Sequence, residues 1–167
     1  AGTFEVIKQG QELAALTDGA FDITVGPLVT AWGFGVEQHN LPPPRATIVE
    51  LLKHSGHDQL HLDVPAKSVR KQDPLMGFDL SAIAKGYAVD QIASAIESKG
   101  VMQYMIEVGG EVRTGGLNAS GEPWRIGIQV PDSKTDSIIQ VVPLVDLAMA
   151  TSGDYRSYYE VDGQRIS

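Results

Sequence analysis

The sequence contains no cysteine. This absence excludes disulfides, thiolate nucleophiles, Cys-ligated zinc and iron–sulfur clusters, and it leaves the redox compartment open. Positive charge is also scarce, because 13 Lys and Arg stand against 21 Asp and Glu for a formal net charge of −8. We therefore expect no basic surface for nucleic acid or acidic lipid.

Long hydrophobic runs are missing as well. No apolar stretch reaches the roughly 18 residues that a membrane span needs, and no secretory signal opens the chain. The 167 residues are 43% apolar and 20% charged, which is typical of a soluble globular domain with a core. No repeat or linker interrupts residues 1–167, so we expect one domain without an internal boundary.

Both ends of the chain predict a segment of a longer protein. Residue 1 is not Met, and the chain enters helical periodicity at once. It ends at Ser167 within a predicted strand, whereas natural domains usually close with a turn or a polar tail.

Three segments have helical periodicity. Residues 3–17 form the first predicted helix, and a glycine-rich loop follows it. The triple proline 42–44 precedes a short second helix that ends by Gly56. Ser81 is predicted to cap a third helix of about 18 residues, which Gly100 terminates.

The remaining segments predict β-strands joined mostly by hairpins. A first hairpin pairs residues 60–64 with 68–71, and Asp162-Gly163 suits a second tight turn. The other predicted strands are 104–108, 111–114, 124–130, 138–142, 148–151 and 155–161, with turns at 109–110, 118–121 and 132–136. Together these segments predict an α+β fold with about three helices and a mostly antiparallel sheet, incomplete at both ends.

The loop of residues 17–28 concentrates two glycines, a proline and two carboxylates around Phe21. Such a loop suits close backbone approach to a ligand, and it equally suits a structured connection between helices. The Asp22 carboxylate can hold a ligand hydroxyl or ring N–H, or it can form an Asx-turn with its own backbone.

The start of the third predicted helix, residues 78–87, offers free N–H groups and the positive end of the helix dipole. Lys85 adds a positive charge one turn in, which favours a phosphate or pyrophosphate. The full glycine pattern of a nucleotide-binding loop is absent, so the residues alone favour the alternative, a capped amphipathic helix with a solvated Lys85.

The glycine pair Gly109-Gly110 lies between Glu107 and Glu111. Paired glycines permit positive φ, so this segment is either a hairpin turn or bulge, or a place of close backbone approach to a ligand.

The four histidines, His39, His54, His57 and His61, match no metal-ligand spacing and are interpreted as surface residues. Neither a Ser-His-Asp nor a Cys-His arrangement can be assembled from the sequence. The residues alone therefore indicate an anionic-ligand site and no further chemistry.

Five ordered segments resemble those of the FAD:protein FMN transferases, the ApbE-type flavin transferases once described as thiamine biosynthesis lipoproteins. They are DGAFDITVGPLVTAWGFG (18–35), DLSAIAKGYAVDQIA (79–93), EVGGEVRTGG (107–116), PWRIGIQVP (123–131) and ATSGDYRSYYEVDGQRIS (150–167). The resemblance implies a periplasmic lipoprotein of the bacterial inner membrane. It would use Mg²⁺ to move FMN from FAD to a threonine hydroxyl of a target protein and release AMP. Typical targets are subunits of sodium-pumping quinone reductases.

The resemblance also implies site residues. Ala20, Phe21 and Asp22 would contact the flavin nucleotide, and Asp79 and Lys85 would line the FAD site. In addition, Gly110 would let the backbone approach the nucleotide, and Ala82 would offer its main-chain carbonyl to Mg²⁺.

Two parts of the family pattern have no counterpart in this chain. A His-containing segment and an Asp/Thr-rich helix start would follow Ser167, so the catalytic His and the other metal ligands are expected beyond that residue. An N-terminal segment with the lipid-attachment Cys, which would make the only membrane attachment, is expected before residue 3.

FMN transfer to a protein is the activity that we expect. One alternative is an FAD pyrophosphatase, in which water replaces the threonine hydroxyl. Another is a module that binds FAD without chemistry, and the least specific interpretation is a globular domain with no ligand.

Overall fold

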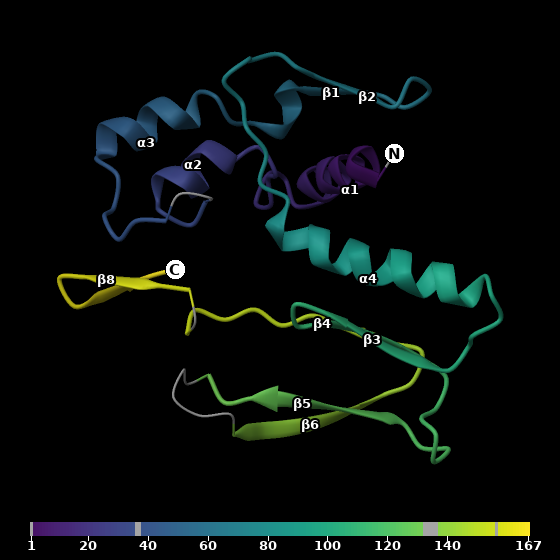
Figure 1. The fold of residues 1–167 in the computed structure, drawn as a ribbon. Coiled ribbons are helices and arrows are strands. Elements are labelled where there is room, and N and C mark those ends of the chain that lie inside the picture. Colours follow the sequence, from purple (N-terminus) through teal and green to yellow (C-terminus); the bar gives the residue numbers. More distant parts are fainter. Residues whose placement is uncertain (1, 36–37, 132–136, 156) are drawn as a thin grey trace. The chain divides into compact units, whose positions relative to one another are not determined.

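The computed structural model describes residues 2–35, 38–131, 137–155 and 157–167 (Figure 1). Within these ranges it contains four α-helices, one 3₁₀ helix and nine strands, and every strand pair is antiparallel. The predicted α+β class is therefore confirmed. The predicted turn at 132–136 lies outside the described residues.

The chain divides into two compact units, one formed by Ala1–Ile83 with Tyr159–Ser167 and the other by Ala84–Tyr158. The expectation of a single domain stays a prediction. The helix that begins at Ser81 carries the chain from the first unit into the second.

The first unit is mainly helical at its N-terminal end. Its helices are α1 (Gly2–Leu16), α2 (Gly26–Ala31), α3 (Arg45–Leu52) and η1 (His57–Gln59), and its strands are β1 (Leu60–Asp63), β2 (Ser68–Lys71), β8 (Tyr159–Val161) and β9 (Gln164–Ile166). Strand β1 pairs with β2, and β8 pairs with β9. The core of this unit is a cluster of Ile7, Ile23, Leu60 and Met76.

One helix of the first unit was not expected from the sequence. Helix α2 lies in the segment predicted as a glycine-rich loop, because Gly26-Pro27 resembles a turn in sequence. Proline at the first turn of a helix loses no hydrogen bond, so Pro27 starts this helix instead of preventing one. The structure likewise uses Pro44 as the residue before α3, as the triple proline predicts.

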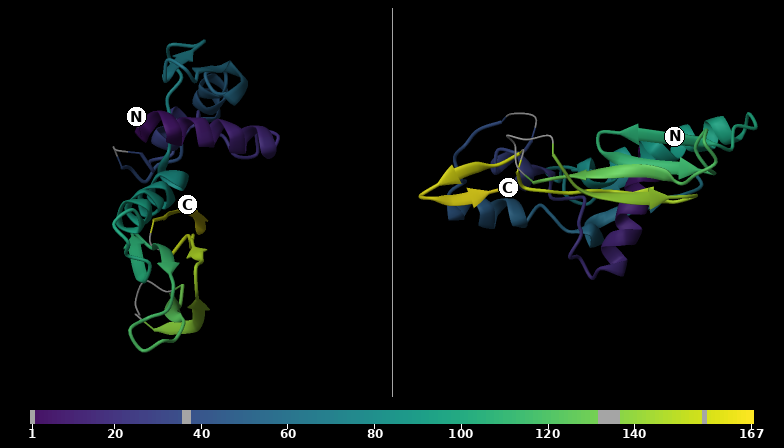
Figure 2. Two further views of the ribbon diagram at one scale, coloured as in Figure 1. Left: turned by 90° about the vertical axis from the view of Figure 1, so that its right-hand side faces the viewer. Right: turned by 90° about the horizontal axis from the view of Figure 1, so that it is seen from below.

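The second unit contains most of helix α4 (Ser81–Glu97) and five strands. These strands are β3 (Tyr104–Val108), β4 (Glu111–Gly115), β5 (Trp124–Gln129), β6 (Ile138–Leu144) and β7 (Ala148–Met149). They form a three-stranded sheet in the order β3-β4-β7 and a separate β5-β6 ribbon, which Figure 2 shows from two further sides. The predicted antiparallel sheet is thus divided into small sheets.

Several predicted boundaries shift in the structure. Strand β6 continues past Val142 through Pro143, which a two-stranded ribbon tolerates because each strand has a free edge. Strand β7 stops at Met149, two residues before its predicted end, and β8 begins at Tyr159 instead of Tyr155. Arg156, within that predicted strand, lies outside the described residues.

Candidate functional site

The loop between α1 and α2 is fixed by the carboxylate of Asp22. Its Oδ1 accepts hydrogen bonds from the backbone N–H and the hydroxyl of Thr24, at 2.8 and 2.7 Å. Its Oδ2 accepts a hydrogen bond from the backbone N–H of His57 at 3.0 Å. Thr24, which is fully buried, in turn accepts a hydrogen bond from the N–H of Gly56 at 2.7 Å. Asp22 therefore forms the predicted Asx-type turn and also ties the loop to the start of η1.

The same loop is joined to the segment that leads into α4. The backbone N–H of Asp79 donates to the carbonyl of Ile23 at 2.8 Å, and Val25 forms a parallel bridge with Gly77. A Cβ on Gly26 would lie 2.7 Å from the carbonyl carbon of Phe78, so only glycine permits this approach. Two segments about 55 residues apart in sequence, both assigned to the FAD site by resemblance, are thus brought together.

The two other loop residues expected to contact FAD differ in their surroundings. Phe21 is half-buried and packs against the core cluster of the first unit. Ala20, by contrast, is exposed. The backbone around Ala20 is therefore open to a ligand, while Phe21 also contributes to the core.

Helix α4 begins differently from the prediction. Ser81 is the first helical residue, and the side chain that accepts its N–H is Asp79, whose Oδ1 lies 2.8 Å away. Asp79 rather than Ser81 thus supplies the cap, because a carboxylate two residues before an N–H reaches it in an Asx geometry. Ala82 is exposed in the first turn.

Lys85 lies on α4 and belongs to the second unit, where it is not simply solvated. Its Nζ donates to the carbonyl of Gly109 at 3.0 Å and lies 2.7 Å from Oε2 of Glu111. Its side chain is still 46% exposed, so the ammonium group is accessible to an anion. Among the predicted site residues, the second unit brings Lys85 to the turn that contains Gly110. The first unit brings Asp79 to Ile23, the residue after Asp22.

The Gly109-Gly110 pair forms the turn of the β3–β4 hairpin. Both glycines have positive φ, +57° and +95°, and Val108 faces Glu111 across the turn. Two successive positive φ angles define the two-residue turn that suits the twist of a hairpin. The hairpin interpretation is therefore confirmed, and a nucleotide contact by Gly110 stays a prediction.

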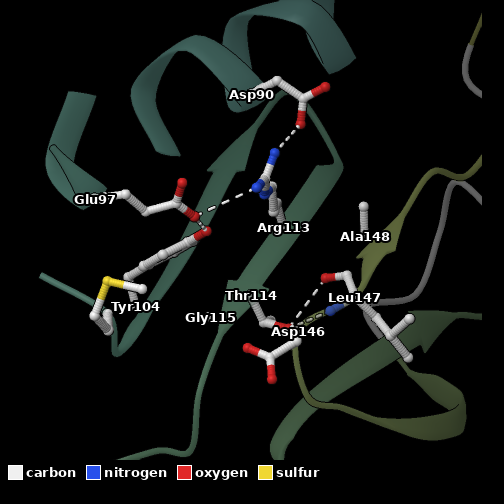
Figure 3. Close-up of a pocket in the computed structure, with 10 residues that line it drawn as sticks. Asp90, Glu97, Tyr104, Arg113, Thr114, Gly115, Asp146, Leu147 and Ala148 are labelled. Atoms are coloured by element: carbon white, nitrogen blue, oxygen red, sulfur yellow. Dashed lines mark hydrogen bonds and ion pairs between the residues drawn. The ribbon is translucent and has the colours of Figure 1, made fainter. Parts of the chain in front are cut away.

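A pocket of about 370 Å³ lies in the second unit between α4 and the β3-β4-β7 sheet (Figure 3). Its one arginine, Arg113, contacts Asp90 at 2.8 Å and Glu97 at 3.3 Å, and Tyr104 donates a hydrogen bond to Glu97. The hydrogen bond to Asp90 raises the pKa of Arg113, and burial together with the Glu97 contact raises the pKa of the Tyr104 hydroxyl. Because two carboxylates already pair with Arg113, this pocket is a poor site for a phosphate group.

The structure corrects the prediction that all the histidines are surface residues. His54, His57 and His61 are partly buried rather than on the surface, and the ring of His54 lies 2.5 Å from Oδ2 of Asp73. Within the described ranges, no group of three His, Cys, Asp or Glu side chains could hold a metal ion. The Ala82 carbonyl as a ligand of Mg²⁺ stays a prediction.

Two residues important to this geometry were not identified from the sequence. Thr24 carries no sequence signal beyond its position two residues after Asp22, which is the spacing of an Asx-turn. In the sequence, Glu111 is recognisable only as a neighbour of the glycine pair, because its contact with Lys85 depends on how α4 packs on β4.

In the described part of the chain, no helix is both long and apolar enough to cross a membrane.

Comparison with known proteins gives a consistent result over the whole chain. The ApbE family model matches residues 1–167. The FAD:protein FMN transferase of Vibrio cholerae serotype O1 is 44% identical over 166 residues, which cover 99% of this chain and 49% of that protein. The protein of the same name from Escherichia coli K12 is 40% identical over 167 residues, 98% of this chain and 47% of that protein.

Solved structures agree with these relatives. The flavin transferase ApbE from Vibrio cholerae superposes with a TM-score of 0.81 at 40% identity, over 93% of this chain and 50% of that chain. The ApbE protein of Thermotoga maritima gives a TM-score of 0.84 at 38% identity, over 98% of this chain and 52% of that one. The chain spans about half the length of the curated relatives it matches. With its fold, its motifs and all 167 residues matched, the chain belongs to the ApbE family.

Proposed function

We propose that the full-length protein containing this chain transfers FMN from FAD to a threonine hydroxyl of a target protein and releases AMP. The observation that carries the proposal is the backbone connection between the 20–25 loop and the residues that start α4. It joins two segments of the family pattern into one surface within the first unit. The names of the relatives, FAD:protein FMN transferase, support flavin transfer as the reaction.

The proposed step is a substitution at phosphorus. The threonine oxygen forms a bond to the FMN-side phosphorus of FAD, and the bond from that phosphorus to the bridging oxygen breaks, so that AMP leaves. The hydroxyl proton passes to a base, which we expect to be a histidine outside this chain. Catalysis of this kind depends mainly on positioning and on neutralising phosphate charge.

The residues of this chain would bind and orient FAD. The open backbone at Ala20 and the half-buried Phe21 and Asp22 would contact the nucleotide. Asp22 can do so while holding the loop, since each carboxylate oxygen has two acceptor sites and Oδ2 accepts one bond from His57. Asp79 would line the same site.

Lys85 and Gly110 would act on the pyrophosphate from the second unit. Lys85 has an accessible ammonium group for charge neutralisation, and Gly110 would allow backbone approach at the hairpin turn. The Ala82 carbonyl would be one ligand of Mg²⁺, whose other ligands would come from outside this chain. When bound, the ion would neutralise phosphate charge.

The acceptor and the location of the protein belong to the same proposal. A subunit of a sodium-pumping quinone reductase is the kind of target that we expect. We also propose that the full-length protein is a periplasmic lipoprotein anchored to the inner membrane through its N-terminus. Recovery of the protein in the inner-membrane fraction, with release on removal of the N-terminal segment, tests this location.

The activity is tested by intact-mass spectrometry of an acceptor peptide after incubation with full-length protein, FAD and Mg²⁺. The expected result is addition of FMN to the peptide threonine, which EDTA prevents and a Thr→Ala peptide does not show. Free FMN and AMP without an adduct would instead indicate a pyrophosphatase. Unchanged FAD would overturn the proposal and indicate a protein that at most binds FAD without reacting with it.

A further inference from the structure

The ammonium group of Lys85 is held by two fixed oxygens. The Gly109 carbonyl lies 3.0 Å and Glu111 Oε2 lies 2.7 Å from Nζ. A lysine has three N–H donors, and one of them is directed to the Gly109 carbonyl. Glu111 contacts the ammonium group as an ion pair, so N–H donors remain for a ligand. Because the Lys85 side chain is 46% exposed, a remaining donor is accessible to a ligand.

Glu111 is a rigid partner for this lysine. It is the first residue of β4, in register with Val108 of β3, and its side chain is only 14% exposed. Its Oε2 is buried and accepts no hydrogen bond of ordinary geometry from the described residues, so its compensation is the charge of Lys85. A buried carboxylate oxygen without a cation is unfavourable, which ties Glu111 to Lys85.

The arginine on the same strand as Glu111 pairs with other carboxylates. Arg113 lies two residues after Glu111 on β4, and it pairs with Asp90 and Glu97 on α4. The Lys85–Glu111 pair and the pairs of Arg113 with Asp90 and Glu97 are therefore neighbours along the contact between α4 and β4. The cation that pairs with Glu111 is Lys85.

The glycine turn completes the arrangement. A Cβ on Gly109 would lie 2.9 Å from Lys85 Cδ, so the lysine stem passes directly over this residue. The absence of a side chain at Gly109 thus allows Nζ to reach both its carbonyl and Glu111.

We propose that Glu111 is a positioning residue, which holds Lys85 at the β3–β4 turn with one N–H directed to a phosphate oxygen of FAD. This inference rests on the proposed function, since it assigns Lys85 to the pyrophosphate. Glu111 itself touches neither FAD nor the reacting atoms.

The first test measures the placement of Lys85 without using activity. Full-length wild type and Glu111→Gln are briefly treated with formaldehyde and a mild reductant, and methylation of each lysine is read by peptide mass spectrometry. We expect Lys85 in Glu111→Gln to react about threefold faster or more, because a charge-assisted contact is lost. Lys99, exposed beyond the end of α4, serves as the internal reference. An unchanged rate at Lys85 would overturn the inference.

The second test separates positioning from general stability. In FMN transfer, Glu111→Gln should lower kcat about tenfold, because Lys85 is no longer held in position. The KM for FAD should change less than about threefold, because losing the negative charge of Glu111 favours FAD binding and compensates for the less ordered Lys85. Glu111→Asp should recover part of kcat. The matched control is Asp90→Asn, which breaks the next ion pair along the same contact and should leave kcat unchanged.

Two outcomes would contradict the inference in this second test. One is a kcat of Glu111→Gln equal to that of wild type, and the other is an equal loss of kcat in Asp90→Asn, which would indicate a structural role. If wild type transfers no FMN, the proposed function fails, and the methylation rate of Lys85 still decides whether Glu111 positions it.

Discussion

The charged residues proposed to contact FAD also hold the local structure. Asp22 accepts three hydrogen bonds within the protein, Asp79 accepts the N–H of Ser81, and Lys85 pairs with Glu111. Substitution by alanine would therefore remove a structural contact together with any contact to FAD. Variants that keep the shape of the side chain are needed to separate the two effects.

Asp79 offers such a separation. Asp79→Ala should lower the free energy of unfolding by about 1 kcal/mol, because the first N–H of α4 loses its acceptor. Asp79→Asn keeps an oxygen at that position and should unfold close to wild type, while FAD binding weakens through loss of the charge. Denaturant melts and FAD titrations of both variants give the answer. Equal FAD affinity in wild type and Asp79→Asn would show that the charge of Asp79 does not contribute to FAD binding.

Lys85 requires a double substitution. Lys85→Met leaves the Glu111 carboxylate without its cation and should cost about 1 kcal/mol of stability, a modest figure because the pair is partly exposed. Adding Glu111→Gln should restore the melting temperature, and FMN transfer should stay low in both variants. Thermal melts read beside transfer rates test this. Recovery of transfer in the double variant would show that Lys85 acts only as the counterion of Glu111.

At the scale of elements, periodicity and turn residues predict the fold well. The helix predicted at residues 3–17 is α1, and the alternating segments around residues 60–71 form the β1–β2 hairpin. The Asp162-Gly163 turn has the expected positive φ values of 50° and 77°. Helix α2 was missed because glycine and proline at a first turn have the same sequence signal as a loop.

The β3–β4 turn leads to a prediction about glycine. Gly109→Ala should destabilise the protein by about 1 kcal/mol through its positive φ, and it should also weaken FAD binding by displacing Lys85. Gly121→Ala is the matched control, since Gly121 has a φ of +74° and open space around it. The control should lose similar stability and keep wild-type FAD affinity in a titration. Equal FAD affinity in the two variants would show that the β3–β4 turn does not contribute to FAD binding.

The contact between His54, just after α3, and Asp73, just after β2, leads to a prediction about pH. The hydrogen bond from His54 lowers the pKa of Asp73 below its ordinary value of 3.8, so the folded state favours the carboxylate. This stabilisation is present above the unfolded pKa and is lost as the pH falls through the lower folded pKa. His54→Gln should return the pKa of Asp73 toward 3.8 and reduce the loss of stability in acid.

Carboxyl NMR titration of Asp73, with melts between about pH 2 and 6, measures this effect. His61→Gln is the control, because the ring of His61 contacts the amide of Gln72 and should not influence Asp73. An unchanged pKa of Asp73 in His54→Gln would contradict the assignment.

At the scale of the whole molecule, the sequence indicates the family but not the contacts within the site. Ordered motifs from residue 18 to residue 167 are enough for the resemblance, which the family match confirms. The Asp79–Ile23, His54–Asp73 and Lys85–Glu111 contacts join residues 19 to 56 positions apart. Such contacts depend on how elements pack, and local periodicity carries no information about that.

The central proposal is that the 20–22 loop and Asp79 of the first unit, and Lys85 of the second unit, each contact the nucleotide of FAD. A crystal structure of the full-length protein with FAD and Mg²⁺ tests it most directly. We expect a phosphate oxygen within hydrogen-bond reach of Lys85 Nζ, with Glu111 still paired to that lysine. We also expect the nucleotide to contact Ala20, Phe21 and Asp22. FAD bound elsewhere, with Lys85 beyond hydrogen-bond reach of every phosphate oxygen, would contradict it.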